Sequence, residues 1–138
     1  MKKKILNHTS IMIVIAVLIT FLAASVVTYN KFNTYMQNGI SEDARYICHG
    51  MEEYGDTFLT KRLRTVSSSR VTLIQKDGTV LFDSKTSPEK LGNHSNRPEF
   101  VEAEKEGKSE SIRYSETYAK KTFYYALRLE NGNVLRVG

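Results

Sequence analysis

An uncharged, apolar run near the amino terminus constrains this chain more than any other feature. Residues 5–30 contain no Asp, Glu, Lys or Arg, and Ile, Val, Leu, Ala and Phe dominate the run. A membrane-spanning helix needs about 20 such residues, because each adds about 1.5 Å and the hydrocarbon core is about 30 Å thick. The hydroxyls of Thr20 and Ser25 can bond to the helix's own carbonyls. We therefore predict a transmembrane helix over residues 10–29.

Two other uses of such a run stay open. The three lysines at residues 2–4 and the small residues 23–25 also suit a cleaved secretory signal. The run, however, continues through Val27, beyond the usual apolar region of about 7 to 15 residues in a signal. A lipid anchor would need a cysteine where this chain has Ser25. We favour a retained helix.

The basic residues beside the run predict its orientation. Three lysines precede it, whereas Lys31 alone follows it directly. Because cytoplasmic flanks are enriched in Lys and Arg, residues 1–9 are expected in the cytoplasm and the rest outside. The predicted location is the plasma membrane, with a single pass in the sequence as given.

Beyond the run, the composition indicates one small domain and its connector. All 15 acidic residues lie there, interspersed with Lys and Arg. A nucleic-acid partner is not expected, because its binding surface would need a clustered basic patch. Cys48 is the single cysteine, so an internal disulfide is impossible. Its thiol is expected to be a small, partly buried side chain or, alternatively, to bridge two copies of the chain.

An apolar stripe with helical spacing follows the run, so residues 30–64 are predicted as a membrane-proximal helical segment. The stripe packs either on the domain's own sheet or on the same helix of a second copy in a parallel dimer. Gly55 is expected to end this helix before a short second helix over residues 57–63. The stripe consists of Ile40, Ala44, Ile47, Met51, Tyr54 and Phe58.

The periodicity then becomes strand-like. Asp77-Gly78 and Asn131-Gly132 predict two hairpin turns. Between the hairpins, Pro98 opens a short helix that Gly107 ends, and Glu99 and Glu102 complement the positive end of its dipole. The predicted strands cover residues 71–75, 80–84, 109–115, 121–130 and 133–137.

Four motifs in this order resemble the extracytoplasmic sensor region of bacterial membrane-bound histidine kinases of the phosphate-regulon and cell-wall sensor type. They are RVTLIQKDGTVLFDS at 70–84, NHSNRPEF at 93–100, SIRYSET at 111–117, and YYA at 124–126 with VLRV at 134–137. The resemblance implies a PAS-like fold of the PDC (Cache) kind, an α+β class. A transmembrane helix would continue into a long helix, followed at residues 65–138 by an antiparallel sheet of about five strands with a short helix.

The resemblance also implies parts beyond Gly138: a second membrane helix, a HAMP linker, a dimerising helix pair with the phosphorylated histidine, and an ATP-binding domain. An apolar strand barely complete at Gly138 favours such a continuation. No cofactor is expected in this chain, since ATP and Mg would belong to the kinase domain. Expected partners are the bilayer, a second copy in a homodimer, an extracytoplasmic ligand or protein, and a response regulator acting through the cytoplasmic part.

The candidate ligand-binding residues come from a loop and two strands. An arginine before a helix start, such as Arg97, can hold a carboxylate or phosphate, although it can also pair with Asp83 or Glu99. Alternation along neighbouring strands gives the other candidates one common face, which in PAS-like domains lines a cavity where one exists; a filled core is the alternative. The candidates are Arg97, Arg113, Ser115, Thr117 and Tyr124.

No catalytic residue is predicted, because the sequence shows no nucleophile and general base at a spacing typical of a catalytic pair. His94, Asp77 and Asp83 form only a weak metal pattern. The expected function is the sensory module of a two-component histidine kinase. The alternatives are the sensor of a chemoreceptor or cyclic-dinucleotide enzyme, and a free-standing anchored binding module.

Overall fold

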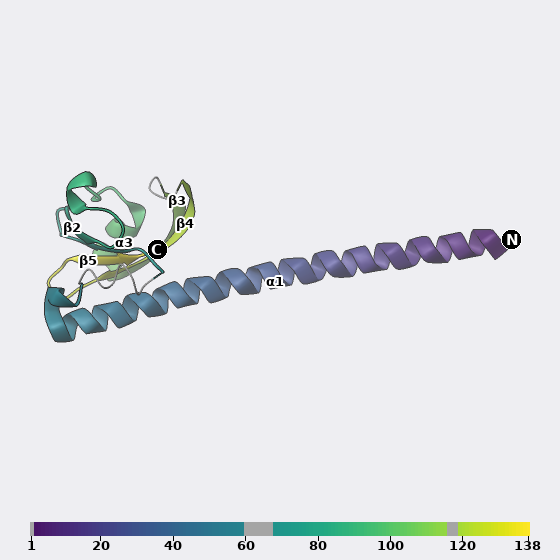
Figure 1. Ribbon diagram of the computed structural model, residues 1–138, viewed down its shortest axis with the longest axis horizontal. Coiled ribbons are helices and arrows are strands. Elements are labelled where there is room, and N and C mark those ends of the chain that lie inside the picture. The colour runs from purple at the N-terminus through teal and green to yellow at the C-terminus, as the bar shows by residue number, and fades with distance from the viewer. Residues whose placement is uncertain (1, 60–67, 116–118) are drawn as a thin grey trace. The chain divides into compact units, whose positions relative to one another are not determined.

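The computed structural model describes residues 2–59, 68–115 and 119–138 (Figure 1). The chain divides into two compact units, residues 1–36 and 37–138. Its elements are α1 (Lys2–Tyr54), η1 (Gly55–Phe58), β1 (Val71–Ile74), β2 (Val80–Asp83), η2 (Pro88–Lys90), α3 (Pro98–Glu106), β3 (Lys108–Ser115), β4 (Lys120–Arg128) and β5 (Val134–Val137).

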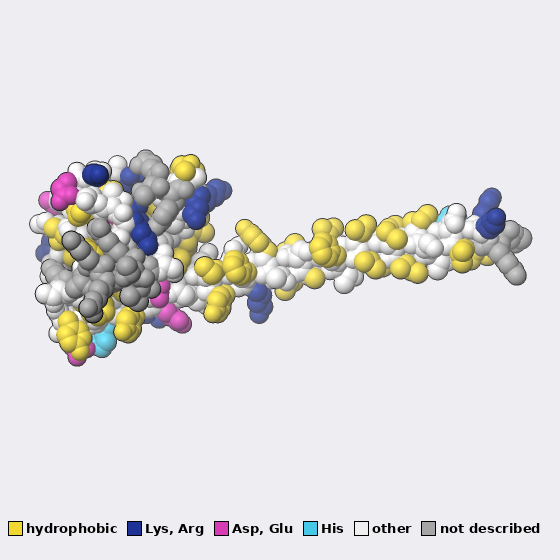
Figure 2. All heavy atoms as spheres, viewed as in Figure 1, with side chains coloured by type: hydrophobic (Ala, Val, Ile, Leu, Met, Phe, Trp, Pro, Cys, Tyr) yellow, Lys and Arg dark blue, Asp and Glu magenta, His cyan; other side chains and the backbone are white. Residues whose placement is uncertain are grey.

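The first unit consists of the amino-terminal part of α1. Its large apolar side chains are exposed, and in the space-filling view hydrophobic side chains follow the helix behind a basic amino-terminal end (Figure 2). Thr20 and Ser25 donate their hydroxyls to the carbonyls of Ala16 and Phe21, both at 2.8 Å. Within the described residues, one helix is long enough and apolar enough to cross a membrane, and that helix is α1.

The second unit contains a five-stranded antiparallel sheet in the order β2-β1-β5-β4-β3. The predicted turns join its hairpins: Gly78 and Gly132 adopt φ of 84° and 80°, the left-handed region that glycine enters without strain. The central strand β5 pairs with β1 and β4, so Arg136 lies opposite both Thr72 and Ala126. The predicted sheet is confirmed.

One face of the sheet packs against residues 40–51 of α1. Ala44, Ile47 and Met51 are buried in a cluster with side chains of β1, β4 and β5, including Leu73 and Leu135. The apolar stripe therefore packs on the domain's own sheet. Tyr54, which we had placed in the stripe, is 61% exposed instead and stacks on Phe58 at 6.4 Å between ring centroids. Ile40 and Phe58, the first and last residues of the stripe, are partly buried against the same cluster, so Tyr54 is the one member that does not pack on the sheet.

The opposite face of the sheet is half apolar and half polar. Phe100 and Ala103 of α3 pack in its apolar half on Ile74, Ala126 and Val134. As predicted, α3 begins at Pro98 and ends at Gly107, whose φ is 84°. The polar half holds the candidate site.

Two details of the segment after α1 differ from expectation. Gly55 does end the helix, with φ of 65°, but residues 55–58 form a 3-10 turn where we had expected a helix from residue 57. The left-handed glycine is followed directly by the 3-10 turn. The rest of that expected helix lies outside the described residues.

Candidate functional site

The polar half of the sheet carries a pocket of about 320 Å³. Arg113 of β3 and Arg136 of β5 rise from the sheet, and Arg70 precedes β1. Lys90 in η2 and the loop before α3, with His94 and Arg97, complete its wall. No Asp or Glu is among the described residues that line it, so the lining is strongly cationic.

A buried polar network fixes these arginines. Glu99, fully buried at the start of α3, accepts hydrogen bonds from Arg113 at 2.8 Å and Arg136 at 3.1 Å. Arg136 also donates to the hydroxyl of Thr72, which donates to Asp83 at 2.8 Å. The Asp83 carboxylate accepts Nε–H of Arg70 at 2.7 Å. The network thus joins α3 to β3, β5, β1 and β2 and holds the guanidinium groups in place.

Glu99 is ionised within this network. Burial alone would raise the pKa of its carboxyl, but the hydrogen bonds from Arg113 and the positive charge of Arg136 hold that pKa below its ordinary value. The sequence places Glu99 at the positive end of the helix dipole. Its side chain points into the sheet, where it is the buried counter-charge of Arg113 on β3 and Arg136 on β5.

Two guanidinium groups lie over one aromatic ring. The Cζ atoms of Arg113 and Arg136 are 4.5 Å and 5.0 Å from the ring centroid of Tyr124, which is itself buried. Cations are attracted to the electron-rich ring face. Tyr124 therefore holds both arginines at the floor of the pocket.

The β1–β2 turn positions His94. Its backbone N–H donates to the carbonyl of Gly78, and the side chain of Asn93 donates to the carbonyl of Asp77, both at 2.8 Å. Burial, together with the charges of Arg136 and its neighbouring arginines, lowers the pKa of His94 to about 4. His94 is therefore neutral near pH 7.

The comparisons with known proteins agree with this architecture. A model of the family described as Single Cache-like matches residues 49–136, more than half of the chain. The chain belongs to the single Cache-like family. No curated protein matches the chain. In this Cache-like domain the matched region includes β1 to β4, β5 up to Arg136, α3 and the residues that line the arginine pocket.

The structure brings most of the predicted ligand-binding residues to one place. Arg97, Arg113, Ser115 and Tyr124 all line the arginine pocket of the Cache-like domain. Thr117 lies outside the described residues. Their role in binding stays a prediction.

Sequence reasoning missed other residues of the pocket, above all Arg70 and Arg136. Arg136 is 2% exposed and stands in the otherwise apolar strand of residues 134–137. An arginine in a strand that must be buried on both faces is itself a signal, because a buried charge needs partners. From this signal a polar site on the sheet could be predicted. The signal does not indicate that Glu99 is the partner of Arg136.

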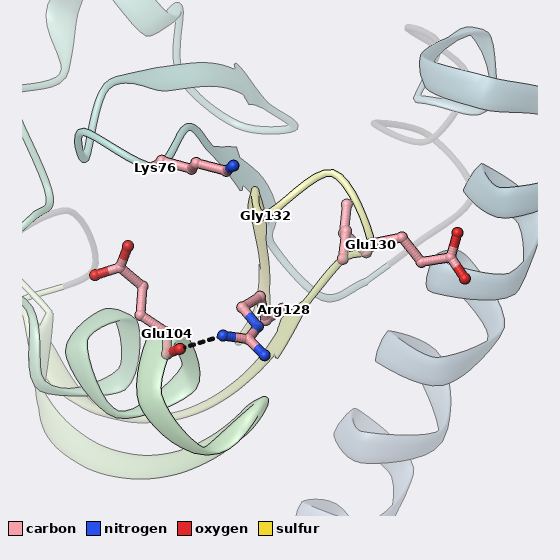
Figure 3. Close-up of a pocket in the computed structure, with 6 residues that line it drawn as sticks. Lys76, Glu104, Arg128, Glu130 and Gly132 are labelled. Carbon is pink, nitrogen blue, oxygen red and sulfur yellow. Dashed lines mark hydrogen bonds between the residues drawn. The ribbon is translucent and has the colours of Figure 1, made fainter.

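A second hollow, of about 490 Å³, lies beside the β4–β5 turn (Figure 3). Arg128 there donates to the backbone carbonyl of Glu104 at 2.6 Å, while the Glu130 side chain extends away from Lys76 and Arg128. Two cations and two carboxylates leave this hollow without a net charge preference.

The weak metal pattern is not assembled. In the described part of the chain, no group of three His, Cys, Asp or Glu side chains is placed to hold a metal ion. Asp83 accepts hydrogen bonds from Arg70, Thr72 and the backbone N–H groups of Lys85 and Thr86.

Proposed function

We propose that this chain is the membrane-anchored, extracytoplasmic sensory module of a two-component sensor histidine kinase. The domain perceives an external stimulus and passes it across the membrane. Family membership supports a sensory role, and the apolar amino-terminal helix supports an anchor. The kinase output rests on the sequence resemblance and is the part that most needs a test.

One observation carries the proposal. The helix that is long and apolar enough to cross a membrane is also the helix whose residues Ala44, Ile47 and Met51 are buried in the core of the sensor domain. A stimulus that repacks this core changes the environment of α1 directly. The free energy available is limited to the ligand's difference in affinity for the two packings.

The natural gene beyond codon 138 provides the first test. A reading frame that continues into a second apolar span, a HAMP linker and an ATP-binding kinase domain supports the proposal. A methyl-accepting or cyclic-dinucleotide domain there would assign the sensor to a different output. A stop codon directly after Gly138 would leave an anchored binding module and contradict signalling through a kinase.

The proposed topology has its own experiment. Single cysteines are placed at Asn7, in the predicted cytoplasmic segment, and at Lys85 in a Cys48→Ser background, and intact cells are treated with a membrane-impermeant maleimide. Labelling at position 85 alone, with position 7 labelled only after lysis, is the expected result. Labelling of position 7 in intact cells would reverse the orientation.

A further inference from the structure

The arginine pocket has an excess of positive charge. Its described lining contains Arg70, Lys90, Arg97, Arg113 and Arg136, whereas the carboxylates that join this network are Asp83 and Glu99. Among the described residues, cations therefore outnumber carboxylates in and around this pocket. Because like charges brought together out of water repel strongly, such a cluster favours the entry of an anion.

Two buried groups in the pocket also lack a bonding partner in the described structure. Arg70 uses Nε for Asp83, and its Nη2 is buried with no acceptor. His94 Nδ1 is likewise buried without a partner. Both side chains are more than nine-tenths buried, at 3% and 6% exposed. A buried polar atom without a partner costs free energy that a ligand oxygen would recover.

The size and lining of the pocket limit the ligand. A volume of about 320 Å³ is at the small end for ligand sites. Leu91 and the ring of Tyr124 supply its main apolar surface, so a long apolar tail has little to pack on. Planar guanidinium groups bind carboxylate, sulfate or phosphate oxygens in pairs. The pocket fits a compact oxyanion.

We propose that this pocket binds a small oxyanion with at least two negative charges, and that His94 takes up a proton as the anion binds. The proposal rests on the proposed sensory function and names its ligand class. It also gives the sensor a response that depends jointly on anion concentration and external pH.

The proton uptake follows from the field around His94. Without an anion, burial and, after it, the surrounding arginines keep its imidazole neutral. A bound dianion offsets part of that positive charge and gives the buried Nδ1–H an acceptor, so the protonated form becomes accessible. Among the described residues, the charged and titratable groups around it are Arg70 before β1, Asp83 on β2, Lys90 in η2, Arg97 and Glu99 at the start of α3, Arg113 on β3, Tyr124 on β4 and Arg136 on β5.

Calorimetric titration of the full chain in nanodiscs of zwitterionic lipid tests the proposal. Sodium sulfate is the main probe because it stays a dianion over the whole pH range used; succinate and hydrogen phosphate are compared at pH 7.5, and acetate serves as the monoanion. We expect sulfate to bind about tenfold more tightly at pH 5.5 than at pH 7.5, the factor for a His94 pKa that returns to its ordinary value. Acetate should bind at least about tenfold more weakly.

Proton uptake is counted by repeating the titration at pH 5.5 in two buffers with different ionisation enthalpies. The wild-type chain should take up close to one proton per sulfate. The His94→Gln variant should still bind sulfate at pH 7.5 but lose both the uptake and the pH dependence. The count on the wild-type chain needs no variant, so it stands even where a substitution at the buried His94 unfolds the domain.

Matched lysine variants locate the anion. Lys90 lines the pocket, whereas Lys85 is exposed on the same loop outside it. Lys90→Gln should weaken sulfate binding about tenfold at both pH values, with Lys85→Gln unchanged.

Specific outcomes overturn each part. Absence of sulfate binding at both pH values, together with absence of hydrogen phosphate and succinate binding at pH 7.5, overturns the site, and equal losses in both lysine variants place the anion elsewhere. Equal sulfate affinity at the two pH values overturns the role of His94. These measurements use this chain alone, so a gene without a kinase domain would refute the proposed output and leave the binding result unaffected.

Discussion

At the scale of single residues, the most consequential interaction is the double ion pair of Glu99. Its carboxylate is fully buried and accepts hydrogen bonds from Arg113 and Arg136. A buried ion pair of this kind adds little net stability compared with an apolar core, but removal of one partner leaves a charge without compensation. Among the described residues, Glu99 is thus a counter-charge shared by the two arginines at the pocket floor.

Replacement of Glu99 by Gln should destabilise the sensor domain by about 3–5 kcal/mol, because Arg113 and Arg136 lose their buried counter-charge. The measurement is urea-dependent pulse proteolysis of the full chain in nanodiscs at pH 7.5. Glu106→Gln, an exposed carboxylate on the same helix, is the control and should change stability by less than about 0.5 kcal/mol. Similar stabilities for the two variants would show that Glu99 is not the essential counter-charge.

Acid should weaken the domain through His94. Its pKa is about 4 in the folded state against 6.5 ordinarily, so the unfolded chain binds a proton that the folded chain resists. The contribution of neutral His94 to the free energy of unfolding is therefore fully present above pH 6.5 and falls as the pH drops toward 4. The expected loss is about 2 kcal/mol between pH 7.5 and pH 5.

The same proteolysis assay in anion-poor buffer measures this loss. The His94→Gln variant should show a much smaller difference between the two pH values. Glu99 contributes little over this interval, because its stabilising charge is lost only below its ordinary pKa of 4.5. A wild-type domain equally stable at pH 7.5 and pH 5 would contradict a neutral, buried His94.

At the scale of elements, turns and caps were predictable because single residues determine them. Two hairpin turns occur where they were predicted, at Asp77-Gly78 and Asn131-Gly132. The short helix α3 also begins at Pro98 and ends before Gly107, as predicted. The role of Glu99 was not predictable in this way. Its partners, Arg113 on β3 and Arg136 on β5, lie 14 and 37 residues further along the chain. Alternation grouped Arg113 with Ser115 correctly, yet only the register of β5 between β1 and β4 places Arg136 at the same site.

The contact between the β1–β2 turn and the loop before α3 depends on Gly78. A Cβ there would collide with the backbone N–H of Ser95 and the side chain of Asn93, and φ of 84° disfavours any other residue. Gly78→Ala should lower stability by about 2 kcal/mol or more and displace His94. Gly92→Ala is the control, because nothing lies within 4 Å of its Cβ.

Thermal melting of the two glycine variants, followed by near-ultraviolet circular dichroism of the tyrosines, checks this prediction. The Gly92 variant should melt within about four degrees of the wild type, since its stability change is expected below about 0.5 kcal/mol. Equal melting temperatures for both variants would mean that the turn and the loop adjust independently.

At the scale of the whole molecule, α1 is the element that joins a segment long and apolar enough to cross a membrane to the sensor domain. The same 53-residue helix contains the exposed apolar segment and the residues buried in the domain core. A helix can transmit a stimulus only where its phase is preserved, since each residue rotates its face by about 100°. Its polar stretch at residues 37–39, where Gly39 has nothing within 4 Å of a Cβ, is a place where added residues disturb no packing.

Insertion of Ala residues after Gly39 therefore distinguishes a signalling helix from a tether. One added Ala shifts the helix phase by about 100°, whereas four restore it to within about 40°. In the sensor kinase proposed above, we expect the one-residue insertion to change phosphorylation of its response regulator and the four-residue insertion to return it toward the wild-type level. Both proteins should insert and bind sulfate normally, because the pocket and the apolar run are intact. A smooth dependence on added length, or no dependence at all, would show that α1 only anchors the domain.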